Sequence, residues 1–397
     1  MGRLGVAERT GAIGRAVAAI LVAIAVGAVA SPPVTAGAGS RTAVVVSLGD
    51  SFISGEGGRW MGNGSEPFGT RSGTDRAALG CGPWGRCRHD PHLVYGDSED
   101  NGCHRSDVAP IASAPIPAGT AVNLACSGAK LENVWGAAAG GQSLRGEPPQ
   151  IDQLSAVARR GGVSLIVLTV GANDVGFGGV VIRCALDWAR SSGSDPRYCR
   201  RSAEKEIDAG LPSMQAGLEK ALRGIHEVMA DAGYRRSDYR LVVMGYASPF
   251  PTGADIRYPQ SGWSRLTDGG CPLWDADAGW AVEQATPSIV ARMHSAATNS
   301  GGEFLDLQHA LDGHQVCDHR SRRVGPAGPD PLSAEWVRRL DFTQGSVRES
   351  LHPNAYGQRA IGACIGLLYA GPRGDYACHD TPGRSYTDGM RLQTLYP

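Results

Sequence analysis

Four short blocks contain residues whose types and order suit acyl transfer. Gly49-Asp50-Ser51 follows an apolar run, Gly128 lies in "NLACSGAK", Asn173 lies in "VLTVGAND", and His352 lies in "RESLHPNAYGQ". A serine hydroxyl is a weak nucleophile until a base removes its proton, and the pKa of histidine suits that task near neutral pH. N–H donors stabilise the negative charge that develops on a carbonyl oxygen. The blocks therefore predict a nucleophile, Ser51, a base, His352, and an oxyanion hole formed by the N–H groups of Ser51 and Gly128 and the side-chain amide of Asn173.

The elements that must position these residues follow an α/β pattern. We expect strands at 43–47, 165–170, 241–245 and 304–305. The first three are almost continuously apolar, as strands covered on both faces are. Apolar residues spaced by three and four predict a helix over 211–229, and Pro353 is a good first residue for another helix. The alternation predicts a layered, mostly parallel sheet, which binds ligands outside the carboxyl ends of its strands.

In this order, GDS, the glycine of CSGA, GAND and HPN resemble the four blocks of the SGNH hydrolases, also called GDSL esterases and lipases. The motifs GDSFISGEG, CHRS and NDVGF, together with paired cysteines, are similar to the secreted actinobacterial esterase and lipase branch. The resemblance spans residues 44 to about 370. It implies a three-layer α/β/α, flavodoxin-like fold with disulfide-tied loop insertions, the site residues named above, and neither a metal nor another cofactor.

One position departs from the family pattern. The family commonly has an aspartate three residues before the histidine, and this chain has Glu349 there. A glutamate could orient the imidazole of His352 and stabilise its charged form. Alternatively, a main-chain carbonyl from that position could serve. In either case we expect residue 349 to orient the histidine.

The N-terminus has the features of a signal peptide. Three arginines precede the apolar run 16–30, which ends in Ala28-Val29-Ala30. Fifteen residues suit a signal-peptide core and are short for a membrane span. We expect residues 1–30 to be removed on secretion, 31–370 to form one hydrolase domain, and 371–397 to form a polar surface tail. An uncleaved membrane anchor is the alternative.

Ten cysteines follow the signal peptide, and in an exported chain this even number favours disulfides. The count alone leaves the connectivity open, but proximity suggests five pairs. They are Cys81–Cys87, Cys103–Cys126, Cys184–Cys199, Cys271–Cys317 and Cys364–Cys378.

Metal sites are the alternative use for some of these residues. A zinc site would draw on Cys81, Cys87, His89, His92, Cys103 and His104, but their spacing matches no common zinc pattern. The stretch DADAG at 275–279 hints at calcium, yet Thr286 stands where an EF-hand loop needs an acid. We therefore expect no metal.

Composition is that of a soluble globular protein, with 42% hydrophobic residues, 19% charged residues and a net charge of −1. This balance gives no indication of nucleic-acid binding. The irregular segments 58–110 and 312–348 are expected to wall a substrate cleft. Together these features predict a secreted, monomeric serine hydrolase that cleaves a small-molecule or lipid ester through an acyl-enzyme. The alternatives are an acyltransferase, a deacylase of a polysaccharide or secondary metabolite, and a surface binding protein on a retired hydrolase scaffold.

Overall fold

The computed structural model describes residues 42–64, 73–82, 87–117 and 119–395, so the predicted signal peptide lies outside it. The strands are β1 (Ala43–Gly49), β2 (Ala78–Cys81), β3 (Cys87–His89), β4 (Gly119–Asn123), β5 (Val163–Thr169), β6 (Arg240–Met244), β7 (Glu303–Asp306), β8 (Tyr376–His379) and β9 (Arg391–Thr394). The α-helices are α1 (Ser51–Ser54), α2 (His92–Tyr95), α3 (Ser98–Asn101), α4 (Pro110–Ser113), α5 (Leu131–Val134), α6 (Gln150–Ala158), α7 (Phe177–Ala189), α8 (Arg200–Asp231), α9 (Asp275–Trp280), α10 (Thr286–Ser300) and α11 (Ala355–Ala370).

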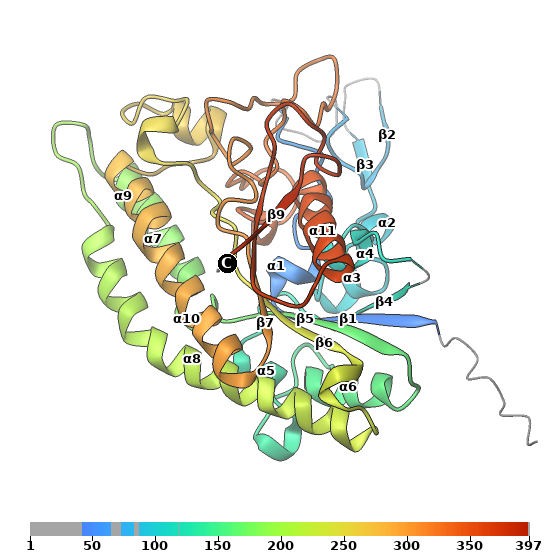
Figure 1. The fold of residues 1–397 in the computed structure, drawn as a ribbon. Helices are drawn as coiled ribbons and strands as arrows, with labels where there is room; N and C mark the ends of the chain where they lie inside the picture. The colour runs from blue at the N-terminus through green and yellow to red at the C-terminus, as the bar shows by residue number, and fades with distance from the viewer. Residues whose placement is uncertain (1–41, 65–72, 83–86, 118, 396–397) are drawn as a thin grey trace, which may run out of the picture. The chain divides into compact units, whose positions relative to one another are not determined.

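Seven of the strands form one sheet in the order β4-β1-β5-β6-β7-β8-β9 (Figure 1). All neighbours pair in parallel except β8 and β9, which are antiparallel. The remaining two strands, β2 and β3, form a separate antiparallel hairpin. The predicted α/β fold with a mostly parallel sheet is confirmed.

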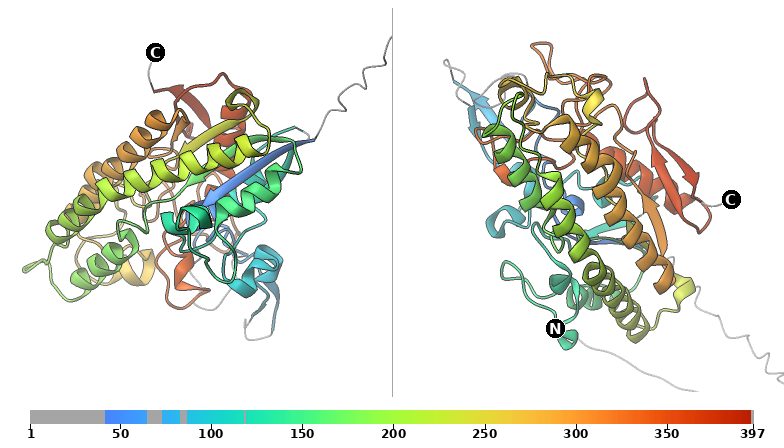
Figure 2. Two further views of the ribbon diagram at one scale, coloured as in Figure 1. Left: turned by 90° about the horizontal axis from the view of Figure 1, so that it is seen from below. Right: turned by 90° about the vertical axis from the view of Figure 1, so that its left-hand side faces the viewer.

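Successive residues of the central strands point to opposite faces of the sheet and enter different cores. Val46 and Leu48 of β1 pack in the core that also contains buried residues of α5, α6, α8 and α10. Val45, one residue away, packs in the second core with residues of α1, α4 and α11. The long helix α8 runs along one face of the sheet (Figure 2). Because both faces of the sheet are covered, these strands are apolar almost throughout and do not alternate between apolar and polar residues.

The helix that carries His352 at its entrance begins later than predicted. The expected first residue was Pro353, but α11 starts at Ala355 because Asn354 caps it. The Asn354 side chain accepts hydrogen bonds from the N–H groups of Tyr356 and Gly357, two donors that the first helical turn leaves unpaired. The cap leaves His352 in the loop that precedes the helix.

The expectation of a surface tail over 371–397 is wrong for its described part. Residues Tyr376–His379 form β8, which extends the sheet beyond β7, and β9 pairs with β8. The disulfide between Cys364 and Cys378 ties β8 to α11. Met390 is completely buried. The segment therefore covers an edge that β7 would otherwise leave unpaired, a role that its polar sequence did not reveal.

The two irregular segments are ordered against each other. The described part of 58–110 contains the β2–β3 hairpin and the short helices α2, α3 and α4. Within 312–348, Trp336 and Arg338 are buried although the segment has little regular structure. Asn63 joins the two segments, since its side-chain nitrogen lies 2.6 Å from Glu335 Oε2 and 2.8 Å from the carbonyl oxygen of Val337. Buried side-chain hydrogen bonds of this kind hold these irregular segments in place of the main-chain hydrogen bonds of a helix or a sheet.

Four disulfides are described, and all four are pairs that proximity suggested. They join Cys103 to Cys126, Cys184 to Cys199, Cys271 to Cys317 and Cys364 to Cys378. Cys81 and Cys87 face each other in the register of the β2–β3 hairpin. The Cys81 side chain is outside the described structure, so the fifth pair stays a prediction. Among the described residues, no helix is both long enough and apolar enough to cross a membrane.

Candidate active site

Ser51 stands where β1 gives way to α1. Asp50 caps the helix, because its side chain accepts a hydrogen bond from the N–H of Phe52 at 3.0 Å. Gly49 has a φ of +134°, and a side-chain carbon on it would lie 1.8 Å from the carbonyl oxygen of Thr169, so only glycine fits. Ser51 is the first residue of α1, so its N–H group has no partner within the helix. Among the described residues, no acceptor forms a hydrogen bond with it.

The side chain of His352 reaches Ser51 across 301 positions of sequence. Its Nε2 atom lies 2.7 Å from Ser51 Oγ, and its Nδ1 atom lies 3.0 Å from the carbonyl oxygen of Ser350. A proton on Nδ1 would donate to that carbonyl, which leaves Nε2 free to accept the serine proton. Burial lowers the pKa of His352 below its usual 6.5 and thus favours the neutral imidazole at neutral pH.

Gly128 and Asn173 lie at the same carboxyl edge of the sheet, after β4 and β5. Gly128 has a φ of +84° and its N–H has no acceptor within the described part of the chain. Asn173 donates one amide hydrogen to the carbonyl oxygen of Ala129 at 2.9 Å, which fixes the side chain and leaves its second hydrogen available. The strand β4, which leads to Gly128, was not predicted, because its sequence GTAVN is short and mostly exposed.

The Glu349 carboxylate does not bond His352, contrary to one of the two predicted roles for this residue. Its Oε2 atom accepts hydrogen bonds from Trp60 Nε1 at 2.9 Å and from the N–H of Ser346 at 3.0 Å. Its Oε1 atom accepts a hydrogen bond from the Tyr95 hydroxyl at 2.8 Å. His352 instead bonds main-chain groups, as in the alternative, but these belong to Ser350, whose carbonyl oxygen lies 3.0 Å from Nδ1, and to Arg348, rather than to residue 349. Glu349 is instead a buried anchor for the loop that carries the histidine.

Glu56 is a buried carboxylate near the site that no sequence motif indicates. It is completely buried, and His104 Nδ1 lies 2.8 Å from its Oε1 atom. Ser127, the neighbour of Gly128, also donates a hydrogen bond to it. The charge of Glu56 raises the pKa of His352 and opposes the effect of burial. The only local sign of this residue is a glutamate between two glycines, in the stretch GEG. The sequence does not show that its side chain is buried beside a histidine.

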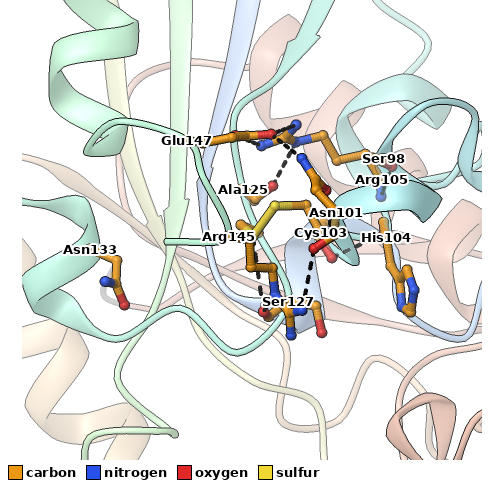
Figure 3. The surroundings of a disulfide bond; sticks show 12 residues. Ser98, Asn101, Cys103, His104, Arg105, Ala125, Ser127, Asn133, Arg145 and Glu147 are labelled. Atoms are coloured by element: carbon orange, nitrogen blue, oxygen red, sulfur yellow. Dashed lines mark hydrogen bonds and ion pairs between the residues drawn. A yellow bond between two sulfur atoms is a disulfide. The ribbon is translucent and has the colours of Figure 1, made fainter. Parts of the chain in front are cut away.

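A disulfide joins the two loops around Glu56. Cys103 and Cys126 connect the His104 loop to the loop that carries Ser127 and Gly128 (Figure 3). The N–H of Ser127 donates to the carbonyl oxygen of Cys103 at 3.0 Å, so the loops are also joined through the main chain. This link fixes the glycine amide relative to the buried ion pair.

The residues considered for zinc are used in other contacts. His89, His92 and His104 each pair with carboxylates, and Cys103 is in a disulfide. No group of three or more His, Cys, Asp and Glu side chains in the described ranges is arranged to hold a metal ion.

Known proteins similar to this chain are lipases and esterases. No protein-family model matches it. The chain is 28% identical to Lipase 2 of Streptomyces coelicolor over 222 residues, which are 54% of this chain and 61% of that lipase. It is 24% identical to a lipase of Streptomyces rimosus over 265 residues, 66% of this chain and 75% of that lipase. The match to Lipase 2 thus spans less than two thirds of that protein.

Solved structures that match the chain include the extracellular lipase of Streptomyces rimosus, with a TM-score of 0.43, 20% identity, and coverage of 83% of this chain and 100% of the lipase. Phospholipase A1 of Streptomyces albidoflavus gives a TM-score of 0.45, again with 20% identity and coverage of 83% and 100%. Among these proteins, the two curated sequence relatives confirm the predicted resemblance to the actinobacterial lipase and esterase branch of the SGNH hydrolases.

Proposed function

We propose that this protein is a secreted serine hydrolase of carboxylic esters. The observation that carries the proposal is the 2.7 Å contact between Ser51 Oγ and His352 Nε2, beside two main-chain N–H groups without acceptors in the described structure. The similarity to Streptomyces lipases supports the same reaction class.

The reaction uses groups of this chain alone. His352 Nε2 takes the hydroxyl proton of Ser51 while Oγ forms a bond to the ester carbonyl carbon. The carbonyl electron pair moves onto oxygen, where the N–H groups of Ser51 and Gly128 and the free amide hydrogen of Asn173 stabilise it. The intermediate then expels the alcohol, which takes the proton from His352. Water then attacks the acyl-enzyme while His352 takes its proton. The second intermediate expels Ser51 Oγ, which takes the proton back from His352, and the carboxylic acid is released.

His352 must carry a positive charge between these two proton transfers. The carbonyl oxygen of Ser350 accepts the Nδ1 proton, and the charge of Glu56 favours the protonated ring. In this proposal a carbonyl dipole and a buried anion together take the part that a triad carboxylate plays elsewhere. Neither depends on the Glu349 carboxylate.

The test is hydrolysis of a short-chain aryl ester by the purified mature protein and its Ser51→Ala variant. The variant should lose turnover and labelling by a fluorophosphonate. Ser213→Ala, at an exposed position of α8, is the matched control and should retain both. Undiminished turnover of Ser51→Ala would reject the assignment. Asn173→Ala should lower kcat by about 10²- to 10³-fold, the usual cost of one oxyanion donor.

We also infer that the protein is exported as a monomer. The predicted signal peptide and the four disulfides support an oxidising destination. N-terminal sequencing of protein from a culture supernatant should begin at Ser31, and light scattering should give the monomer mass. Protein retained in the membrane with residues 1–30 intact would support the anchor instead.

A further inference from the structure

Arg145 occupies an unusual backbone position near the candidate active site. Leu144 and Glu147 exchange two main-chain hydrogen bonds of 3.1 and 2.9 Å around Arg145 and Gly146. Both central residues have positive φ, +53° for Arg145 and +81° for Gly146, which is the pattern of a two-residue type I′ hairpin. Such turns favour Asn-Gly, because asparagine tolerates positive φ better than arginine does. The arginine therefore holds a position that backbone preference would give to another residue.

The guanidinium of Arg145 is fixed by main-chain oxygens. Its Nε atom donates to the carbonyl oxygen of Ser127 at 3.1 Å, and Nη1 donates to that of Asn101 at 3.3 Å (Figure 3). The remaining nitrogen, Nη2, has no acceptor within the described residues and lies 3.8 Å from the position of a side-chain carbon on Gly128. A positively charged donor without an acceptor thus stands next to the glycine of the proposed oxyanion hole.

A second arginine faces the same place. A side-chain carbon on Gly102 would lie 2.7 Å from Nη1 of Arg145 and 3.8 Å from Nη1 of Arg348. Arg348 is exposed and pairs with no carboxylate in the described structure. The positive charge of Arg348 and burial both lower the pKa of Arg145. Two like charges repel each other, and an anion bound between them would offset this repulsion.

Carboxylates close to these arginines are already engaged. Glu147 forms a bidentate ion pair with Arg105, at 2.7 and 2.5 Å, and also accepts a hydrogen bond from Asn101. Glu56, whose charge reaches Arg145, is hydrogen-bonded to His104. Glu99 Oε2 makes no hydrogen bond in the described part of the chain and lies 3.4 Å from His104 Nε2, to which it is ion-paired. Within the described residues, neither arginine thus has an ion pair with a carboxylate, and their free donors point to an anion that arrives with a ligand.

We propose that Arg145 and Arg348 form an anion-binding subsite that receives a phosphate group of the substrate beside the ester bond. Planar guanidinium groups match phosphate oxygens with parallel hydrogen bonds. The position next to Gly128 places that phosphate near the carbonyl under attack. The preferred substrate is accordingly an ester whose alcohol carries a phosphate, either a glycerophospholipid or a soluble phosphate-bearing ester. This inference rests on the proposed ester hydrolysis.

The test compares two matched substrate pairs. Dihexanoylphosphatidate and dihexanoylglycerol, both kept monomeric, form the lipid pair, and 2-acetoxyethyl phosphate and 2-acetoxyethanol form the soluble pair. Wild type should have a kcat/KM at least about tenfold higher for the phosphate-bearing ester, the size of one hydrogen bond to a charged group. A preference in both pairs would indicate any phosphate-bearing ester, and a preference in the lipid pair alone would indicate a phospholipid.

Variants connect the preference to the two arginines. Arg145→Asn keeps a residue suited to the turn and removes the charge, and Arg348→Gln removes the exposed partner. Each should lower the ratio of kcat/KM values about tenfold. Arg145→Lys should keep part of the preference. Arg160→Gln, before β5 at the opposite edge of the sheet, is the matched control and should keep all of it. Thermal unfolding verifies that each variant is folded.

Failure of this inference differs from failure of the proposed function. Hydrolysis of both members of each pair without a preference, or a preference that neither variant reduces, would overturn the subsite and leave the esterase standing. Absence of hydrolysis altogether would reject the esterase. Even then, calorimetric titration with inorganic phosphate should detect binding that Arg145→Asn weakens about tenfold, and equal binding by both proteins would reject the subsite.

Discussion

Replacement of Glu349 by glutamine separates two possible mechanisms. In a triad, the acid bonds the histidine, and its conversion to an amide lowers kcat by about 10⁴-fold. In this structure the Glu349 carboxylate bonds Trp60, Tyr95 and Ser346, while His352 Nδ1 bonds a main-chain carbonyl. We therefore expect the turnover rate of Glu349→Gln to stay within about tenfold of wild type.

The effect on stability follows from the same contacts. Glutamine keeps one carbonyl oxygen for Trp60 and the N–H of Ser346, and its amide can donate to a rotated Tyr95 hydroxyl. Burial already raises the pKa of Glu349, so the neutral amide replaces a carboxylate whose charge is disfavoured. The loss should be about 1 kcal/mol of unfolding free energy. Alanine instead leaves the buried donors of Trp60 and Tyr95 unpaired, at about 1–3 kcal/mol each, together with the half-buried N–H of Ser346. The summed loss is a large fraction of the stability of a domain.

The assay is turnover of a short-chain aryl ester together with urea unfolding of the same samples. Glu56→Gln is the informative comparison, because this carboxylate is the one whose charge affects the pKa of His352. A contradictory result would be a turnover rate for Glu349→Gln that is lower by about 10³-fold or more, with an unfolding free energy within about 1 kcal/mol of wild type. Such a result would mean that the carboxylate reaches the histidine during turnover.

Three further predictions concern the surroundings of the site. Glu56→Gln should move the acid limb of the kcat/KM profile to lower pH, because it removes the charge that raises the pKa of His352. A limb that moves to higher pH would contradict this. Replacement of Cys103 and Cys126 by serine opens a loop with a sequence separation of 23 and should cost about 3 kcal/mol in urea unfolding. Burial raises the pKa of Asp50 from 3.8 to about 7, so its stabilising contribution is complete below pH 3.8 and lost as pH rises through about 7. Asp50→Asn should flatten this decline in unfolding free energy measured from pH 4 to 8, and an unchanged slope would count against it.

Several parts of the fold were predictable because their signals are local. The apolar run before Gly49 predicts β1, and the spacing of Leu218 and Leu222 predicts the core-facing stripe of α8. The strands β4, β8 and β9 escaped prediction. They lie toward the edges of the sheet, where short, partly exposed sequences suffice because a neighbouring strand supplies the hydrogen bonds. Pairing is decided by that neighbour, which a local pattern does not contain.

The sequence by itself determined which residues could perform the chemistry. Ser51, Gly128, Asn173 and His352 follow from four blocks, and parallel strands bring their carboxyl ends to one edge of a sheet. Tertiary structure decided how the histidine is held. Only the fold places the Ser350 carbonyl on Nδ1 and turns the Glu349 carboxylate away from it. Hydrogen bonds and buried charges depend on distances of a few ångströms between segments far apart in sequence, and residue types alone do not fix those distances.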